Sequence, residues 1–269
     1  MNKWKVAILA GLTIILVHSA GMGAEAPQTP IAAPSSADLA KKSQNPISDM
    51  VSVPFQYNYY TGGALGRHSM TVVNFQPVIP SRLNKDWNLI TRVIVPMSSV
   101  PGGGLGTGDS TVSLFFSPRR AGGTTWGIGP IFQLPTASDS SRGTQTFAIG
   151  PTAVLVKMHK QWVYGGLIHY LSTVGSSNSG LRTNEIFLQP FVNYNLPHGL
   201  ALSFAPGITC DFTRPAGDQW TVPVGFGISQ ILKIGKQSTN VGLAVYYNAV
   251  RTVASPEWNF RFQITLLFP

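Results

Sequence analysis

The last twelve residues of the chain, 258–269, alternate between large apolar side chains and polar or small ones. Only Leu267 interrupts the polar positions; the apolar residues are Trp258, Phe260, Phe262, Ile264, Leu266 and Phe268. Successive side chains of a strand point to opposite faces, whereas a helix would scatter these six residues around its circumference. The segment is therefore predicted to be a strand with one apolar face, and the fold depends on whether protein or lipid covers that face.

The N-terminal segment has the pattern of a secretory signal peptide. Lys3 and Lys5 precede an apolar run at 6–17, and small residues around Ala24 suit a cleavage site. The run is too short for a membrane-spanning helix, and no later segment has that length of uninterrupted apolar residues. We predict Sec-type export with removal of residues 1–24, which would lower the net charge from +9 to about +7 because two lysines are lost.

Composition excludes several classes of protein. The single cysteine, Cys210, rules out an internal disulfide framework. Charged residues make up only 11% of the chain, which is sparse for a soluble surface of this size. Lysine and arginine are dispersed along an exported chain, so we expect no nucleic-acid partner despite the basic balance.

Residues 25–50 are predicted to be a flexible periplasmic leader. Residues 26–34 are rich in Pro, Ala and Thr. The stretch 36–43 is compatible with one or two helical turns, with Ser35 or Ser36 as the N-cap and Pro46 beyond the end. We interpret this leader as a tether on the periplasmic side in preference to a plug inside a pore.

From residue 51 onward, strand-like segments of about ten residues follow one another, separated by turn-forming residues. Residues 51–269 are therefore predicted to form an all-β domain of about twelve strands. The predicted strands are 51–59, 71–80, 87–97, 110–116, 125–135, 146–156, 161–171, 184–196, 200–212, 219–232, 240–248 and 258–269.

The connections between these segments are sorted by length. Every second one is tight, namely 81–86, 117–123, 157–160, 197–199 and 233–238. The others tend to be longer and rich in Gly and Ser, namely 61–68, 98–109, 136–143, 172–183 and 249–257, with 213–218 shorter. Short periplasmic turns and longer external loops are typical of a closed antiparallel transmembrane β-barrel. A secreted β-sandwich, the alternative, has no reason to sort its loops in this way.

The polar faces of the strands also favour a barrel. They carry small or weakly polar residues where a soluble sheet would carry many Lys and Glu. Aromatic residues near strand ends are typical of interfacial girdles, namely Tyr59, Trp87, Trp126, Trp162, Trp220 and Trp258.

Three features depart from a simple barrel pattern. Phe187 and Phe191 fall on the polar side of their strand, and the segment 87–97 is apolar on both faces apart from Asn88 and Arg92. Prolines, which remove a ladder hydrogen bond, recur inside predicted strands, and bulges would be needed to accommodate them. These prolines are Pro77, Pro130, Pro151, Pro190, Pro206 and Pro223.

Long motifs across the mature chain resemble a bacterial outer-membrane β-barrel family. The motifs lie at 45–56, 76–80, 86–92, 115–118, 189–197, 220–225, 233–237 and 261–263. The family is commonly labelled "transporter" or phenol-degradation meta-pathway protein, and some members carry the misapplied name neuromedin U. The resemblance implies the outer membrane of a Gram-negative bacterium and uptake of aromatic compounds. One departure is that Pro269 follows Phe268, where such barrels usually end on an aromatic residue.

Catalytic, cofactor and metal sites are not predicted. His169 and Ser172 suggest a barrel hydrolase, but a spacing of three puts them on opposite faces of a strand. The glycine-rich stretch 102–108 lacks the lysine and helix of a phosphate loop. The acidic residues show no metal-ligand spacing; they are Asp109, Asp139, Glu185, Asp211, Asp218 and Glu257.

The function predicted from these features is passive diffusion of small solutes, aromatic or hydrophobic ones among them, through an outer-membrane channel. A non-conducting structural or adhesive barrel is the alternative, and a membrane-embedded hydrolase is a weaker third. Outer-membrane lipid, the solute and, through the C-terminal strand, the barrel-assembly machinery are the expected partners. The predicted pore-lining residues are Gln56, Asn58, Asn74, Gln76, Arg92, Gln133, His169, Glu185, Gln189, Asp211, Arg261 and Gln263.

Overall fold

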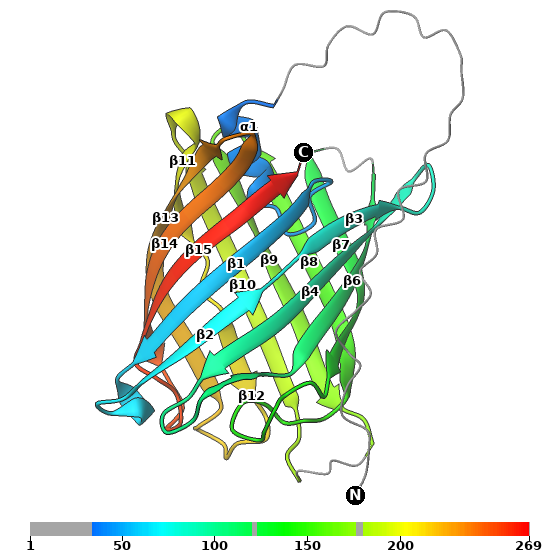
Figure 1. Ribbon diagram of the computed structural model, residues 1–269. Coiled ribbons are helices and arrows are strands. Elements are labelled where there is room, and N and C mark those ends of the chain that lie inside the picture. Colours follow the sequence, from blue (N-terminus) through cyan, green and yellow to red (C-terminus); the bar gives the residue numbers. More distant parts are fainter. Residues whose placement is uncertain (1–33, 120–122, 176–179, 269) are drawn as a thin grey trace, which may run out of the picture. The chain divides into compact units, whose positions relative to one another are not determined.

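The computed structural model describes residues 34–119, 123–175 and 180–268 (Figure 1). The predicted signal peptide and the first part of the predicted leader lie outside the described residues. Within the described part of the chain, no helix is long and apolar enough to cross a membrane. The elements are α1 (Ser36–Ser43), β1 (Val51–Thr61), η1 (Gly63–Leu65), β2 (Ser69–Phe75), β3 (Val78–Arg82), β4 (Trp87–Ser99), β5 (Leu105–Thr107), β6 (Ser110–Pro118), β7 (Thr124–Leu134), β8 (Ala148–His159), β9 (Trp162–Thr173), β10 (Asn184–Asn195), η2 (Pro197–Gly199), β11 (Leu200–Phe204), β12 (Ile208–Asp211), β13 (Trp220–Ile234), β14 (Gln237–Val250) and β15 (Trp258–Phe268).

The strands form one closed antiparallel barrel. β1 pairs with β15 along its whole length, from Val51 opposite Phe268 to Thr61 opposite Trp258, and β9 pairs with β10, so the sheet has no free edge. β2 and β3 together make one barrel strand, as do β11 and β12, while β5 is a short ribbon paired with β4. The barrel therefore has twelve strands, which confirms the predicted fold class.

Large apolar side chains point outward from this barrel. Phe226 is 68% exposed and Leu243 is 60% exposed, and Phe260 and Phe262 of β15 lie on the same outer surface. The alternate residues of β15 face the lumen, where Thr265 is buried. Because the described strands form a single closed sheet, no second sheet within the described residues covers the outer face. The β-sandwich alternative is therefore excluded.

The prolines inside the strands lie where the ladder is broken or shifted. Pro77 occupies the break between β2 and β3, and Pro206 occupies the break between β11 and β12. Pro223 lies at a register shift against β14. Pro130 and Pro151 face each other across β7 and β8. The missing N–H groups thus fall at irregularities of the closed sheet, which is the solution that bulges provide.

Glycines next to two of these prolines bring neighbouring strands unusually close. A Cβ atom at Gly129 would overlap the carbonyl oxygen of Leu114 in β6, and one at Gly150 would overlap that of Tyr170 in β9. Regular pairing is absent at these places on both sides of the β7–β8 pair. Glycine is required there because the backbones approach without room for a side chain.

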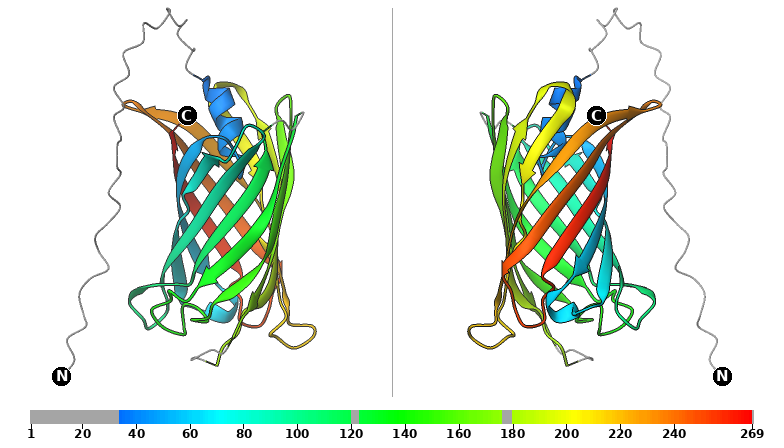
Figure 2. Two further views of the ribbon diagram at one scale, coloured as in Figure 1. Left: turned by 90° about the vertical axis from the view of Figure 1, so that its right-hand side faces the viewer. Right: turned by 90° about the vertical axis from the view of Figure 1, so that its left-hand side faces the viewer.

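Connections of different length lie at opposite ends of the barrel (Figures 1 and 2). The short-turn end carries the connections 83–86, 160–161 and 235–236, together with α1 and the end of β15. The long-loop end carries 62–68, 100–109, 135–147 and 251–257. The predicted sorting of connections by length is confirmed.

Helix α1 and the segment after it pack into the short-turn end of the barrel (Figure 2). The Oγ atom of Ser35 accepts a hydrogen bond from the N–H of Asp38 at 3.1 Å, which caps the helix. Leu39, Ala40 and Met50 are buried against inward-facing side chains of β13 and β15. This burial contradicts the interpretation of the segment as a free tether: residues 34–50 fill part of the barrel mouth.

Candidate functional site: a polar chamber in the barrel lumen

A cavity of about 580 Å³ lies inside the barrel and is here called the polar chamber. Residues of β1–β4, β10 and β12–β15 line it, together with Ser43 at the end of α1 and residues 44–46 after it. Its described lining includes two arginines and neither Asp nor Glu. The chamber brings together Gln56, Asn58, Asn74, Gln76, Arg92, Gln189, Arg261 and Gln263 of the predicted pore-lining residues.

A chain of side-chain hydrogen bonds runs along the chamber wall from Arg92 toward Arg261. Nη2 of Arg92 donates to Oε1 of Gln76 at 3.0 Å, and the side-chain amides of Gln76 and Gln56 are in contact. At the other end, the amide oxygen of Gln56 accepts from the guanidinium of Arg261, whose Nε also donates to Oδ1 of Asn58 at 3.0 Å. Neutral amides thus connect two cations on four neighbouring strands, because β15, β1, the β2–β3 strand and β4 are adjacent.

The opposite side of the lumen is filled by apolar side chains, here called the apolar cluster. Phe115 has no exposed surface and Leu167 is 1% exposed. Ile47, from the segment after α1, packs into the same group. The members are Ile47, Val78, Ile90, Phe115, Val154, Val156, Val163, Leu167 and Phe191. The cluster explains why Phe191 and, packed beside it, Phe187 fall on the polar side of their strand.

Sequence reasoning did not predict this filling of the lumen. The available signal was the apolar character of both faces in strand segments such as 87–97, which contains Ile90. A strand with two apolar faces has to bury its inner face somewhere, and in a closed barrel only the lumen offers partners.

His169 lies at the edge of the apolar cluster and does not line the polar chamber. Its ring stacks on Phe187 with the centroids 5.0 Å apart. Ser172, three residues along β9, falls on the other face of the strand. The two residues considered for a hydrolase therefore do not come together. Within the described residues no group of three or more His, Cys, Asp or Glu side chains is placed to hold a metal ion.

A second cavity, of about 260 Å³, lies at the long-loop end. Three further predicted residues, Gln133, Glu185 and Asp211, line it. Asp109 also lines it, and this carboxylate accepts hydrogen bonds from the backbone N–H groups of Ala137 (3.0 Å) and Gln145 (2.9 Å). Asp109 therefore holds the 135–147 loop against the mouth of the barrel.

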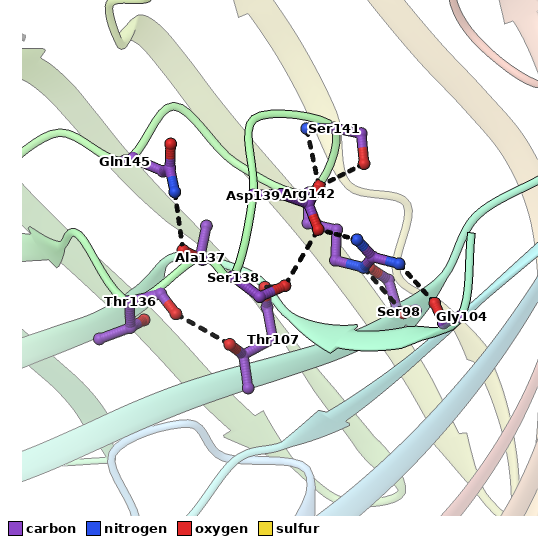
Figure 3. Close-up of polar contacts among 10 residues, drawn as sticks. All are labelled: Ser98, Gly104, Thr107, Thr136, Ala137, Ser138, Asp139, Ser141, Arg142 and Gln145. Atoms are coloured by element: carbon purple, nitrogen blue, oxygen red, sulfur yellow. Dashed lines mark hydrogen bonds and ion pairs between the residues drawn. The ribbon is translucent and has the colours of Figure 1, made fainter. Parts of the chain in front are cut away.

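Arg142 fastens the same loop a second time, and an ion pair with Asp139 of that loop holds it in place (Figure 3). Arg142 also donates to the carbonyl oxygens of Ser98 and Gly104, so it connects the loop to β4 and to the segment before β5. Hydrogen bonds from Ser141, together with the charge of Arg142, hold the pKa of Asp139 below its ordinary value. The carboxylate therefore stays ionised at any pH where a free aspartate would be.

A third cavity, of about 190 Å³, lies toward the short-turn end and shares Pro46, Gln189 and Arg261 with the polar chamber. Amide groups fasten the N-terminal segment beside it. Nε2 of Gln44 donates to Oδ1 of Asn195 at 2.9 Å, and Nδ2 of Asn195 donates back to Oε1 of Gln44 at 3.0 Å. The segment 34–50 thus narrows the lumen at this end.

Comparisons with known proteins agree with the fold. No family model matches the chain, and no curated protein matches it. Among solved structures, an outer membrane channel from Pseudomonas putida F1 superposes with a TM-score of 0.59 at 15% identity, over 82% of this chain and 96% of that one. The NanC porin superposes with a TM-score of 0.50 at 12% identity, over 81% and 99%. At such low identity the likeness shows the fold alone, a closed barrel similar to outer-membrane barrels.

Proposed function

We propose that the protein is an outer-membrane channel through which small solutes, aromatic or hydrophobic ones among them, diffuse passively. The outer surface of the barrel supports the membrane location, because exposed aromatic and aliphatic side chains would be unfavourable in water. A closed barrel also satisfies its backbone hydrogen bonds within the sheet, as a hydrocarbon environment requires. Outer-membrane lipid is the partner of this surface.

The orientation follows from the two ends of the barrel. Outer-membrane barrels place short turns and both chain ends in the periplasm and long loops outside the cell. The short-turn end, with α1 and the end of β15, is therefore assigned to the periplasm. This assignment agrees with Sec-type export after cleavage near Ala24 and with delivery to the barrel-assembly machinery through the C-terminal strand.

The observation that carries the channel proposal is a row of cavities along the lumen. The cavity at the long-loop end reaches Pro96 and Glu185, and the polar chamber begins two residues further along the same strands, at Ile94 and Phe187. The chamber in turn shares lining residues with the cavity at the short-turn end. Polar side chains line this row, so water and small solutes can occupy it.

One observation favours the alternative of a non-conducting structural barrel. The apolar cluster and residues 34–50 occupy much of the lumen, and Ile47 joins the two. A barrel of twelve strands has a narrow interior, so this filling leaves little free cross-section. Conduction in this protein therefore depends on the polar chamber and on how firmly the N-terminal segment is held.

Planar bilayer recordings separate the two functions. The mature chain should give small discrete current steps, and a variant lacking residues 34–50 should give larger ones because the short-turn end is then unobstructed. Folding of both proteins is checked by heat-dependent mobility in gel electrophoresis. If both folded proteins leave the bilayer silent, the channel proposal is wrong and the structural barrel is favoured.

A further inference from the structure

The positive charges of the polar chamber are not neutralised by protein carboxylates. Within the described residues the ion pairs are Lys42–Asp49, Arg142–Asp139, Arg214–Asp211, Arg214–Asp218 and Arg251–Glu257. Neither Arg92 nor Arg261 takes part in any of them. Two guanidinium groups on the wall of one chamber, whose described lining holds no acid, raise the electrostatic potential there.

Arg92 lines the chamber and retains donors that no acceptor of the described residues uses. An arginine carries several N–H donors, and in the described part of the chain only Nη2 of Arg92 is used, toward Gln76. Donors that face a cavity and lack a protein partner are satisfied by water or by a ligand. The guanidinium fork matches a carboxylate, which can accept two parallel hydrogen bonds.

Arg261 is held in place by neutral groups only. Its Nε atom donates to Asn58, the amide oxygen of Gln56 accepts from the same guanidinium, and the guanidinium lies over the ring of Tyr246, 5.0 Å from the centroid. A cation–π contact fixes the position of the guanidinium without cancelling its charge. Arg261 is thus pre-organised for an anion, which reduces the entropy lost on binding.

The chamber also offers apolar surface for the remainder of an organic molecule. Ile94 and Phe187 line it at the side nearer the long loops, and Tyr60 and Tyr246 line it elsewhere. Its volume of about 580 Å³ lies within the range typical of small-molecule sites. A site with cationic and apolar walls is suited to a small organic acid more than to a hydrated inorganic ion.

The charges of the cavity at the long-loop end contrast with those of the chamber. Asp109 accepts hydrogen bonds from the loop backbone, and Asp211 pairs with Arg214 at 3.3 Å. Arg142 and Arg182 line the same cavity. Opposite charges are therefore mixed at that end, and uncompensated positive charge occurs further inside.

We propose that the polar chamber is a binding site for small organic carboxylates, in which Arg92 and Arg261 supply the positive charge. The proposal rests on the proposed channel function and deepens it, because it names anionic organic acids as the preferred solutes. The carboxylate is bound by the guanidinium groups, and the organic part lies against Ile94 and Phe187.

Isothermal titration calorimetry on the folded protein in detergent tests the site without requiring conduction. Sodium benzoate and benzamide are suitable probes, because they have the same ring and similar size but differ in charge. Benzoate should bind at least about tenfold more tightly, since a charge-assisted pair is lost in benzamide. Equal binding of the two probes, or no binding of benzoate, overturns the proposal.

Variants assign the effect to the two arginines. Arg92→Gln and Arg261→Gln should each weaken benzoate binding about tenfold, while Arg92→Lys should retain part of it because the charge remains. Arg82→Gln is the matched control: it removes the same charge at the exposed end of β3 and should leave binding unchanged. If Arg92→Gln and Arg82→Gln bind benzoate alike, the chamber is not the site.

Competition and current recordings complete the test. Sodium chloride at concentrations equal to those of benzoate should not displace it; displacement would make this a general anion site and refute the carboxylate proposal. In bilayers, benzoate should reduce the chloride current of the mature chain and not that of Arg92→Gln. A silent bilayer with the calorimetric signal intact refutes the channel and supports the carboxylate site. Current steps that benzoate does not reduce support the channel and refute the carboxylate site.

Discussion

On the side formed by β6, β8, β9 and β10, the lumen of this barrel is packed like the interior of a soluble protein. On the side formed by β14, β15, β1, β2 and part of β4, it holds a chamber lined by amides and two arginines. Both sides have the same outer surface of exposed apolar side chains. The difference shows that the two sides of one barrel can have different roles. The packed side stabilises the fold through buried apolar side chains, Ile47 among them, and the polar side leaves space for a solute.

The largest expected effect lies in the apolar cluster. Phe115→Ala should lower the free energy of unfolding by about 3–5 kcal/mol, because a fully buried aromatic side chain is replaced by a cavity. Gln263→Ala on the polar side should cost about 0.5–1.5 kcal/mol, because it removes one hydrogen bond, from Nε2 to Thr265 at 3.0 Å. Denaturant unfolding in lipid vesicles measures both. Equal losses would mean that the two sides do not differ in packing.

A second pair of variants tests the outer surface that the two sides share. Phe262→Arg should cost about 2–4 kcal/mol, because it places a cation in the hydrocarbon region. Gln263→Arg, one residue further along β15, points into the chamber and should still fold. Heat-dependent gel mobility after refolding into vesicles reports the outcome. Comparable damage from both variants would remove the assignment of faces.

A smaller effect is expected where the N-terminal segment is fastened. Gln44→Ala removes the reciprocal amide hydrogen bonds with Asn195. The free energy needed to detach the N-terminal segment from the barrel should fall by about 1–2 kcal/mol. Trypsin cleavage after Lys42 in the folded protein should then accelerate roughly 5- to 30-fold. Gln161→Ala is the control, because only the backbone carbonyl of Gln161 contacts Asn195. Unchanged cleavage in Gln44→Ala would show that other contacts hold the segment.

The smallest effect is expected at the long-loop end. Asp139→Asn should leave barrel stability unchanged but increase hydrogen exchange of the loop amides, because the ion pair with Arg142 is lost. Since the pKa of Asp139 is lowered in the folded protein, its stabilisation is present above the unfolded pKa and disappears as the pH falls through the folded pKa. The loop should therefore remain protected in mildly acidic solution.

Glu257→Gln, which affects a different loop through its ion pair with Arg251, should not change exchange in the 135–147 loop. Loop exchange in Asp139→Asn equal to that of the unmutated chain would show that Asp109 and the backbone contacts of Arg142 fasten the loop without the ion pair.

The outer face of the barrel could be predicted from the sequence because lipid or solvent imposes the same period of two on every strand. In β15, Phe260 and Phe262 indicate which face of the strand points outward, without knowledge of any neighbouring strand. Most predicted polar inward residues, such as Gln56 and Arg261, reach the chamber for the same reason. Whether they line a conducting pore stays a prediction.

The contents of the lumen could not be predicted in the same way. Which inward side chains meet depends on strands distant in sequence, as when Ile90 of β4 and Val163 of β9 join one cluster. The segment 34–50 carries few apolar residues, among them Leu39 and Ile47, and their burial needs a barrel that is already closed. The prolines could not be explained from the sequence for the same reason. The sheet accommodates them at breaks in strand pairing, such as the one between β2 and β3, and these breaks depend on neighbouring strands.

The central claim, that one half of the lumen is filled and the other is accessible to water, can be tested by cysteine accessibility. In a Cys210→Ser background, Gln263→Cys and Leu167→Cys place single thiols on the two sides. A membrane-impermeant, water-soluble maleimide should label the folded Gln263→Cys protein and leave Leu167→Cys unlabelled until the protein is denatured. Labelling of both folded variants at the same rate would contradict the account.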